Sequence, residues 1–351
     1  MASNGETVQI PIRRPRADLT CFADIQESRL EWLWPGRIPL GKLSVIAGDP
    51  GLGKSLVTIA IAAAVTSEAK WPDCHEYAPH GSVILLSGED DDSDTVKPRL
   101  RAAGADLDNI YSMSAVIEND DGSRRGLALD RDMELLRDAI RRIPDCRLVV
   151  IDPLAAFLGS VDSHKNADVR GLLSVLAEIA QESRVAILYV SHLNKGTGGP
   201  MARITGSGAF VAAARSGMIV GRDPENADRR IIFMPKCNLS KEVEGVAYRV
   251  RESSEDSELP VVQWEQGFVD VDGETLLSSE GSNNCRERTE AAEWLVVELS
   301  TGPQLTTDLQ SKAKQAGHAW RTVRRAKDEL GVRPRHDGIS GKWRWVLPGN
   351  E

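Results

Sequence analysis

The chain has 351 residues, of which 41% are hydrophobic and 27% are charged, so it can form one large domain and a smaller one. Its formal net charge is −9. It contains no run of 18 apolar residues, and its first 18 residues lack an apolar core, which argues against a membrane span and a secretory signal. Five scattered cysteines without a CxxC pair indicate a reducing compartment. We therefore expect a cytoplasmic protein.

Short apolar segments alternate with helical patterns over the first half of the chain. Residues 1–20 are polar and are predicted to be flexible. Buried strands are predicted at residues 42–47, 82–87, 147–152 and 185–190. Helices are predicted at residues 55–69 and around residues 133–143 and 169–179. Because unbroken apolar strands are buried on both faces, this alternation predicts an α/β fold with a mainly parallel sheet.

The helical patterns stop after residue 221. Three segments follow, "RRIIFMP", "GVAYRV" and "PVVQW", and we expect them to be antiparallel strands that extend one edge of the sheet. The large domain is predicted to cover residues 21–277. Residues 278–284, "SSEGSNN", have the composition of a linker, and a second domain is predicted at residues 285–351.

The segment "GDPGLGKS" fits the phosphate-binding pattern G-x-x-x-x-G-K-[ST] and lies between a predicted strand and a predicted helix. Its glycines allow backbone N–H groups to turn toward a phosphate. Lys54 is predicted to reach the β- and γ-phosphates of ATP, and the Ser55 hydroxyl is predicted to ligate Mg²⁺. The predicted nucleotide-binding residues are Gly48, Asp49, Pro50, Gly51, Leu52, Gly53, Lys54, Ser55 and Leu56.

Polar residues follow three of the other predicted strands. Asp152 ends the strand "LVVID" and is a candidate for the Mg²⁺ shell. Glu89 follows the strand at residues 82–87 and is the candidate base for water attack. Asp90, Asp91 and Asp92 remain alternatives for that role. His192, in "YVSHLNKG", is a candidate γ-phosphate sensor together with Ser191.

The order of these motifs, followed by "GSGAFVAAARSG" and "MPKCNLS", resembles the RecA-fold ATPases of the plasmid RepA-type hexameric helicase group, relatives of DnaB and RecA. The resemblance covers residues 22–252. It implies that Glu89 is the catalytic carboxylate, that Asp152 is the Walker B acid and that His192 is the sensor. It also implies that Arg215 is an arginine finger that reaches the nucleotide of a neighbouring subunit, accompanied by Lys236. The expected assembly is a homo-oligomer such as a hexamer.

Two further segments would line the central channel in that family, residues 155–170 and residues 194–208. The second is rich in glycine, and its charges are Lys195 and Arg203. A mobile basic loop can follow a phosphate backbone, so these two residues are candidates for contact with single-stranded DNA. A nucleotide-sensing lid has the same composition and stays an alternative.

The C-terminal part differs in charge from the rest of the chain. Residues 285–351 carry 12 Lys and Arg against 9 Asp and Glu, a net charge of +3, whereas the remainder carries −12. Helices are predicted at residues 289–303, 305–317 and 318–331, followed by a hairpin around residues 337–341. This order resembles a winged helix–turn–helix whose third helix enters the major groove of duplex DNA.

Basic residues are concentrated in the third helix and the hairpin. The candidate DNA-binding residues there are Arg321, Arg324, Arg325, Arg335, Lys342 and Arg344. A module that binds protein, or one that caps the large domain, stays an alternative.

Taken with the resemblance, the sequence predicts an ATP- and Mg²⁺-dependent ATPase that acts on DNA as a helicase-like motor in plasmid, phage or bacterial replication. One alternative is a DNA-binding regulatory or loader ATPase without unwinding activity. Another is a small-molecule phosphotransferase that uses the same phosphate-binding loop.

Overall fold

The computed structural model describes residues 19–118, 122–162, 165–193, 209–224, 226, 228–240, 243–254, 256–270, 276, 281–300, 302–336 and 343–347. The chain divides into two compact units, Met1–Glu31 and Trp32–Glu351. The described part of the first unit contains one 3₁₀ turn, Phe22–Asp24, and exposes the side chains of Leu19 and Phe22. The larger unit begins at Trp32 and contains both the large domain and the C-terminal module.

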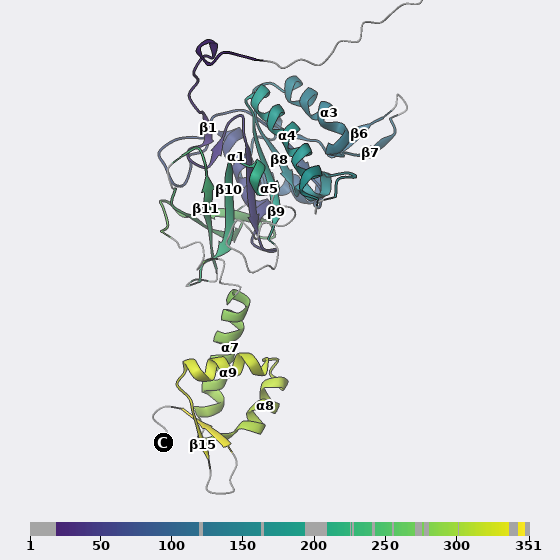
Figure 1. Ribbon diagram of the computed structural model, residues 1–351. Helices are drawn as coiled ribbons and strands as arrows, with labels where there is room; N and C mark the ends of the chain where they lie inside the picture. Colours follow the sequence, from purple (N-terminus) through teal and green to yellow (C-terminus); the bar gives the residue numbers. More distant parts are fainter. Residues whose placement is uncertain are drawn as a thin grey trace, which may run out of the picture. The chain divides into compact units, whose positions relative to one another are not determined.

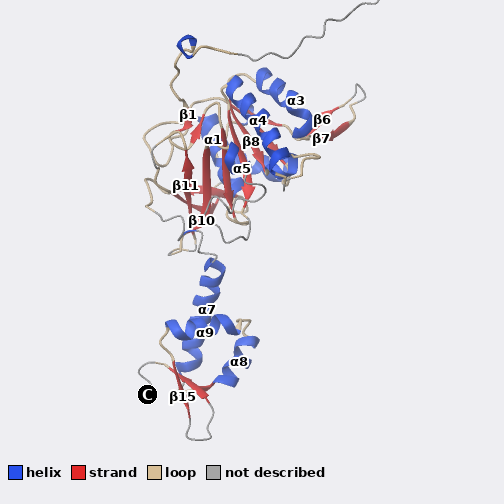
Figure 2. Cartoon of the chain, in the orientation of Figure 1, coloured by secondary structure: helices blue, strands red, loops and turns tan. Residues whose placement is uncertain are grey.

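The centre of the large domain is a nine-stranded sheet within the described residues, in the order β13-β12-β11-β10-β3-β9-β8-β4-β5 (Figures 1 and 2). Strands β10, β3, β9, β8, β4 and β5 run parallel, and β11, β12 and β13 continue the sheet antiparallel at one edge. The strands are β3 (Leu43–Gly48), β4 (Ser82–Ser87), β5 (Ile110–Ser112), β8 (Cys146–Asp152), β9 (Ala186–His192), β10 (Ser216–Arg222), β11 (Arg229–Cys237), β12 (Val246–Glu252) and β13 (Pro260–Trp264). The predicted α/β fold and the antiparallel extension are confirmed.

Helices cover both faces of this sheet. On one face, α3 (Leu129–Arg142) and α4 (Asn166–Ser183) contribute Leu136, Ile140 and Val169 to a core with alternate residues of the parallel strands. On the other face, α1 (Lys54–Ser67) and α2 (Lys97–Ala102) pack against the intervening residues of those strands. Because both sheet faces are covered, the central strands are apolar without alternation.

The other short elements surround this core. They are β1 (Trp32–Trp34), β2 (Ile38–Pro39), the π-turn Asp92–Val96, the 3₁₀ turns Leu107–Asn109 and Leu154–Phe157, β6 (Ala115–Ile117), β7 (Arg124–Gly126) and α5 (Ala209–Ala213). Trp34 stacks on Trp71 with ring centroids 4.6 Å apart, and its indole N–H donates to Asp73. Arg37 also bonds Asp73, at 2.6 Å, so the buried guanidinium and carboxylate compensate each other's charge.

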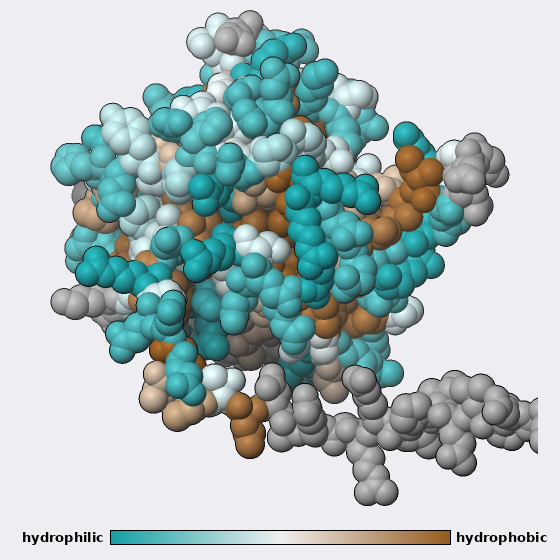
Figure 3. Space-filling model, turned by 90° about the horizontal axis from the view of Figure 1, so that it is seen from above, coloured by the Kyte–Doolittle hydropathy of each residue, from teal (hydrophilic) through white to brown (hydrophobic). Residues whose placement is uncertain are grey.

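The β6–β7 hairpin is a local exception to the polar surface of the large domain. The face in Figure 3 is mainly hydrophilic, and hydrophobic side chains show at the right-hand side, where this hairpin lies. Ile117 of β6 is exposed. Among the described residues, no helix is long and apolar enough to span a bilayer.

The described residues of the C-terminal module form three helices and a three-stranded antiparallel sheet in the order β14-β16-β15. Its elements are α7 (Gly281–Ser300), β14 (Gln304–Leu305), α8 (Thr306–Gln315), α9 (Trp320–Glu329), β15 (Arg333–His336) and β16 (Trp343–Val346). Its core contains apolar residues of all three helices and the indole of Trp345. Helix α7 begins at Gly281, so the last four residues of the predicted linker are helical. Extending an established helix costs little, because the costly step is nucleation.

Candidate functional site

Four segments of the large domain meet at one edge of the sheet. The carboxyl ends of parallel strands lie at the same edge, and the register places Gly48 of β3 beside His192 of β9 and Ser87 of β4 beside Asp152 of β8. The loop after β3 and the segment after β4, which contains Glu89, therefore lie with Asp152 and His192. In open α/β sheets, ligands bind at this end of the strands.

The loop between β3 and α1 depends on its glycines. Gly51 and Gly53 have φ of 77° and 82°, a conformation that side chains with a Cβ adopt rarely. A Cβ on Gly48 would lie 2.8 Å from the carbonyl oxygen of Val220, so β3 and β10 could not keep their present separation. Helix α1 begins at Lys54, and its amino end adds the positive end of the helix dipole to the loop.

Lys54 is held inside this loop. Its side chain is nearly buried, with the residue 6% exposed, and Nζ donates to the carbonyl oxygens of Gly48 at 2.9 Å and Asp49 at 3.0 Å. Burial lowers the pKa of Lys54, whereas the nearby charges of Asp152, Asp49 and Glu89 act to raise it. The ammonium group is therefore a concentrated positive charge. An incoming phosphate can replace the two carbonyl groups as its hydrogen-bond acceptor.

Asp152 lies opposite the start of α1. Thr58 Oγ1 donates to Asp152 Oδ2 at 3.4 Å. Burial raises the pKa of Asp152, and the Ser55 hydroxyl and the charge of Lys54 oppose that effect. Hydroxyl and carboxylate oxygens are ligands of the kind that Mg²⁺ takes, so Ser55 and Asp152 fit the predicted metal position.

The segment after β4 carries four acidic side chains, and three of them are engaged in contacts within the fold. Asp90 forms an ion pair with Arg99 at 2.8 Å, Asp91 caps the π-turn through the N–H groups of Ser93 and Asp94, and Asp92 accepts a bond from Ser112. Glu89 is exposed, and its charge acts on Lys54, Asp152 and His192. Of these four acids, Glu89 is the one whose charge acts on Lys54, Asp152 and His192, so it stays the candidate base.

His192 ends β9 beside the phosphate-binding loop. Burial and the neighbouring Lys54 charge lower the pKa of His192, and Glu89 acts in the opposite direction. Its Nδ1 atom is buried and has no hydrogen-bond partner among the described residues. A neutral imidazole with an unused ring nitrogen can bond a ligand that enters this edge.

Arg215 and Lys236 lie at the opposite edge of the sheet. Arg215 precedes β10, where its N–H donates to Leu43 at the start of β3, and its side chain is exposed. Lys236 of β11 is opposite Gly217 of β10, so the two basic positions are close in the sheet. Both residues therefore lie away from the phosphate-binding loop of their own chain.

Two contacts at this site have no local signal in the sequence. The hydroxyl of Tyr248 on β12 donates to the Leu52 carbonyl at 2.7 Å and ties the loop to the antiparallel strands. Gly88 lets the turn after Asp152 approach β4, since a Cβ there would lie 2.5 Å from the Cβ of Ala156. Thr58 could have been found from its spacing, because it lies one helical turn after Ser55.

The predicted DNA-binding residues are less fully placed. Lys195, Arg203 and Lys342 lie outside the described residues, as do the side chains of Arg321 and Arg325 on α9. Arg324 and Arg335 are exposed, and Arg344 donates to the Pro303 carbonyl. Within the first predicted channel segment, Phe157 and Leu158 are buried in the core of the large domain.

A phosphate-binding loop between a buried parallel strand and a helix, with an acid on a neighbouring strand, defines a RecA-like P-loop ATPase core. The chain belongs to the AAA domain family AAA_25, whose model matches residues 12–198.

The chain is also similar to bacterial proteins named DNA repair protein RadA. It is 26% identical to the protein of Halalkalibacterium halodurans over 188 residues, which is 53% of this chain and 35% of the relative. It is 26% identical to the Mycobacterium tuberculosis protein over 196 residues, 53% of this chain and 34% of the relative. It is 25% identical to a Streptococcus pyogenes protein over 169 residues, 46% of this chain and 30% of the relative. The matched part thus spans about a third of each relative.

Proposed function

We propose that this protein hydrolyses ATP with Mg²⁺ at the carboxyl edge of its sheet and acts on DNA. The observation that carries the proposal is the meeting of Lys54, Asp152, Glu89 and His192 beside one phosphate-binding loop. Four polar groups from four separate segments share this edge, and burial shifts the pKa of three of them, Lys54, Asp152 and His192. Such clustering of perturbed ionisable groups is typical of a catalytic site.

Each residue has a distinct role in this proposal. Lys54 exchanges its two backbone acceptors for phosphate oxygens, and the loop N–H groups bind the same anion. Ser55 and Asp152 hold Mg²⁺, which neutralises phosphate charge when bound. His192 reads the terminal phosphate through its unused ring nitrogen. Glu89 orients the attacking water and accepts its proton.

Arg215 and Lys236 are proposed to serve the nucleotide of an adjacent subunit. They lie at the edge away from their own loop, so they can reach a nucleotide in a homo-oligomer, with a hexamer as the expected form. An arginine on the γ-phosphate stabilises the charge that develops in the transition state. A small-molecule phosphotransferase needs no such residue in trans, and this disfavours that function.

DNA as the partner is supported by two observations. The relatives are named DNA repair proteins, and the C-terminal module has the element order of a winged helix with basic residues on α9 and the hairpin. The finer proposal is a helicase-like motor in plasmid, phage or bacterial replication. A regulatory or loader ATPase is the second candidate, favoured because part of the first predicted channel segment is buried in the core rather than free to contact a strand.

The direct test of the hydrolytic site is Glu89→Gln, which keeps the shape of the side chain and removes its charge. We expect ATP binding to persist and turnover to fall by roughly 10²–10⁴-fold, the usual contribution of a general base. Asp91→Asn is the matched control, because asparagine also caps a turn. Normal turnover in Glu89→Gln, measured by phosphate release, would show that another acid activates the water.

A further inference from the structure

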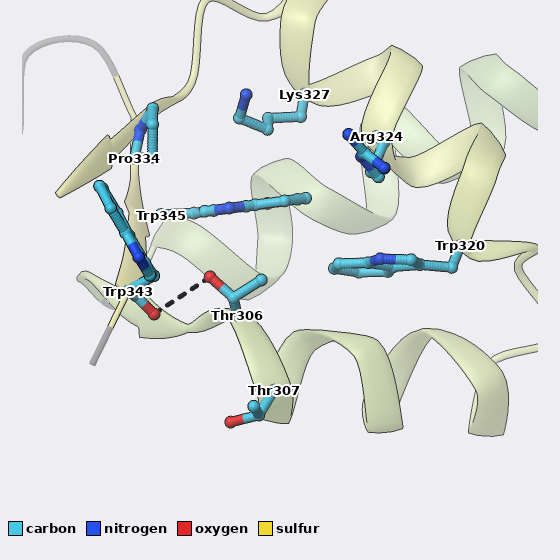
Figure 4. Close-up of a pocket in the computed structure, with 8 residues that line it drawn as sticks. All are labelled: Thr306, Thr307, Trp320, Arg324, Lys327, Pro334, Trp343 and Trp345. Atoms are coloured by element: carbon cyan, nitrogen blue, oxygen red, sulfur yellow. Dashed lines mark hydrogen bonds between the residues drawn. The ribbon is translucent and has the colours of Figure 1, made fainter. Parts of the chain in front are cut away.

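A pocket in the C-terminal module has no role in the site described above. It has a volume of about 670 Å³ and lies between α9, the start of α8 and the β15–β16 pair (Figure 4). Its walls include Trp320, Trp343, Trp345, Arg324, Lys327 and Thr306. Its volume falls within the range of small-molecule pockets.

Three indole rings form the apolar part of the pocket. Trp345 is buried, and its ring stacks on that of Trp320, with centroids 5.1 Å apart and planes inclined by 13°. Trp343 lies two residues away on the same face of β16, but its side chain is 56% exposed. Thr306 Oγ1 donates to the Trp343 carbonyl at 3.0 Å and fixes the backbone there. The pocket is thus lined by one exposed indole, Trp343, and by the stacked indoles of Trp320 and Trp345.

The cationic groups lie together on one side of these rings. Trp320, Arg324 and Lys327 fall on one face of α9, and Figure 4 shows the two basic side chains across the pocket from Thr306 and Thr307. Lys327 Nζ is 5.5 Å from the ring centroid of Trp345. Exposed aromatic surface and positive charge therefore share one opening.

We propose that this pocket holds an unpaired nucleobase of a single-stranded nucleic acid, with the base stacked on Trp343 and the adjoining phosphates beside Arg324 and Lys327. The proposal rests on the DNA role proposed above and names the form of DNA that the module takes. Aromatic platforms combined with basic side chains are the usual means of binding single strands. In a duplex, both faces of each base are covered by its neighbours, so a paired base cannot stack on Trp343.

The test is fluorescence anisotropy on the full-length chain with three labelled probes: an oligo-dT strand, the same strand annealed to oligo-dA, and a strand of equal length made of abasic units. The variants are Trp343→Ala, Trp343→Phe and a control, Val297→Ala, which removes an exposed apolar side chain of α7 outside the pocket. Far-UV circular dichroism checks that each variant is folded.

We expect Trp343→Ala to weaken oligo-dT binding by roughly five- to 150-fold, as for loss of one stacked base, and to leave duplex binding within about twofold. Trp343→Phe should restore most of the affinity, and the abasic strand should bind wild type as weakly as oligo-dT binds Trp343→Ala. Equal losses for strand and duplex, or an abasic strand that binds as tightly as oligo-dT, would overturn the inference.

The same titrations separate this inference from the broader proposal. A wild-type chain that binds DNA, with no effect of Trp343→Ala on oligo-dT, overturns the pocket alone. A folded wild-type chain that binds none of the probes overturns both the pocket and the DNA role. In a fourth titration with labelled poly-glutamate, tight binding that Trp343→Ala abolishes would assign the pocket to an acidic peptide and overturn the nucleic-acid occupant.

Discussion

The loop-side edge of the large domain and the pocket of the C-terminal module both place positive charge at a candidate ligand site, but they do so differently. At the sheet edge, Lys54 and Asp152 are largely withdrawn from water and act on each other. In the pocket, Arg324 is exposed and Trp343 presents a broad apolar surface to solvent. Buried charges suit a small, strongly charged ligand in one fixed position, whereas exposed cations beside aromatic rings suit a long and variable one.

This difference predicts which measured quantity, ATP turnover or DNA affinity, depends on each region. Substitutions at the sheet edge should change ATP turnover and leave DNA affinity intact, because the two sites use separate residues. Substitutions in the C-terminal module should change DNA affinity and its salt dependence while basal turnover stays the same. A variant that changes both ATP turnover and DNA affinity would show that the two regions are not functionally separate.

The largest effect is expected from Arg215→Ala, which tests whether the sheet-edge site is complete within one chain. Removal of an arginine finger should lower turnover by roughly 10³–10⁵-fold. Mixing Arg215→Ala with Lys54→Ala subunits should restore part of the activity, because some interfaces then join an intact loop to an intact arginine. The readout is phosphate release from assemblies whose mixing is verified by mass spectrometry. If verified mixed assemblies stay inactive, Arg215 does not act in trans.

A smaller effect is expected in the C-terminal module, from Arg324→Ala and Arg325→Ala. Each should reduce the slope of log K against log salt for oligo-dT binding by about 0.7, the value for one lost phosphate contact on a single strand. Basal ATP turnover should not change. Lys314→Ala is the matched control, since it removes an exposed positive charge from α8 outside the pocket. A salt slope that is the same in the arginine variants and the wild type would show that these charges face solvent only.

The smallest effect is expected in the pH dependence of the stability of the large domain. Burial and Lys54 lower the pKa of His192 in the folded state. Below the ordinary histidine pKa of about 6.5, the unfolded chain therefore binds more protons at this position than the folded chain, and stability falls as pH falls. Between pH 7.5 and pH 5.5, wild type should lose about 1–3 °C more in melting temperature than His192→Asn. Equal losses of melting temperature in the two proteins across this range would contradict the assignment of a half-buried imidazole with a lowered pKa.

The sequence predicted the sheet edge better than the pocket for a physical reason. The phosphate-binding loop is one contiguous segment, and Glu89, Asp152 and His192 each follow an apolar run, so the rule that parallel strands end at one edge brings them together. Tyr248 was missed because its contact with Leu52 joins residues distant in sequence. Strands β7 and β14 were missed because they are short and partly exposed, and therefore lack an apolar run.

The pocket depends on tertiary packing in the same way. The alternation of Trp343 and Trp345 predicted a strand, but the stacking of Trp345 on Trp320 of α9 follows from how the hairpin packs on the helix. Likewise, the start of α7 at Gly281 could not be separated from a linker, because residues 278–284, within which the helix begins, are rich in Ser, Asn and Gly.

The central claim is that ATP hydrolysis at the sheet edge is coupled to DNA. The most direct measurement is steady-state phosphate release by the full-length chain as oligo-dT is added at fixed ATP and Mg²⁺, with Lys54→Ala as the inactive variant and Lys70→Ala as its matched lysine control. We predict turnover that rises and saturates with DNA in the wild type and in Lys70→Ala, and none in Lys54→Ala. Turnover that is the same with and without DNA, or a folded wild-type chain that releases no phosphate, would contradict the account.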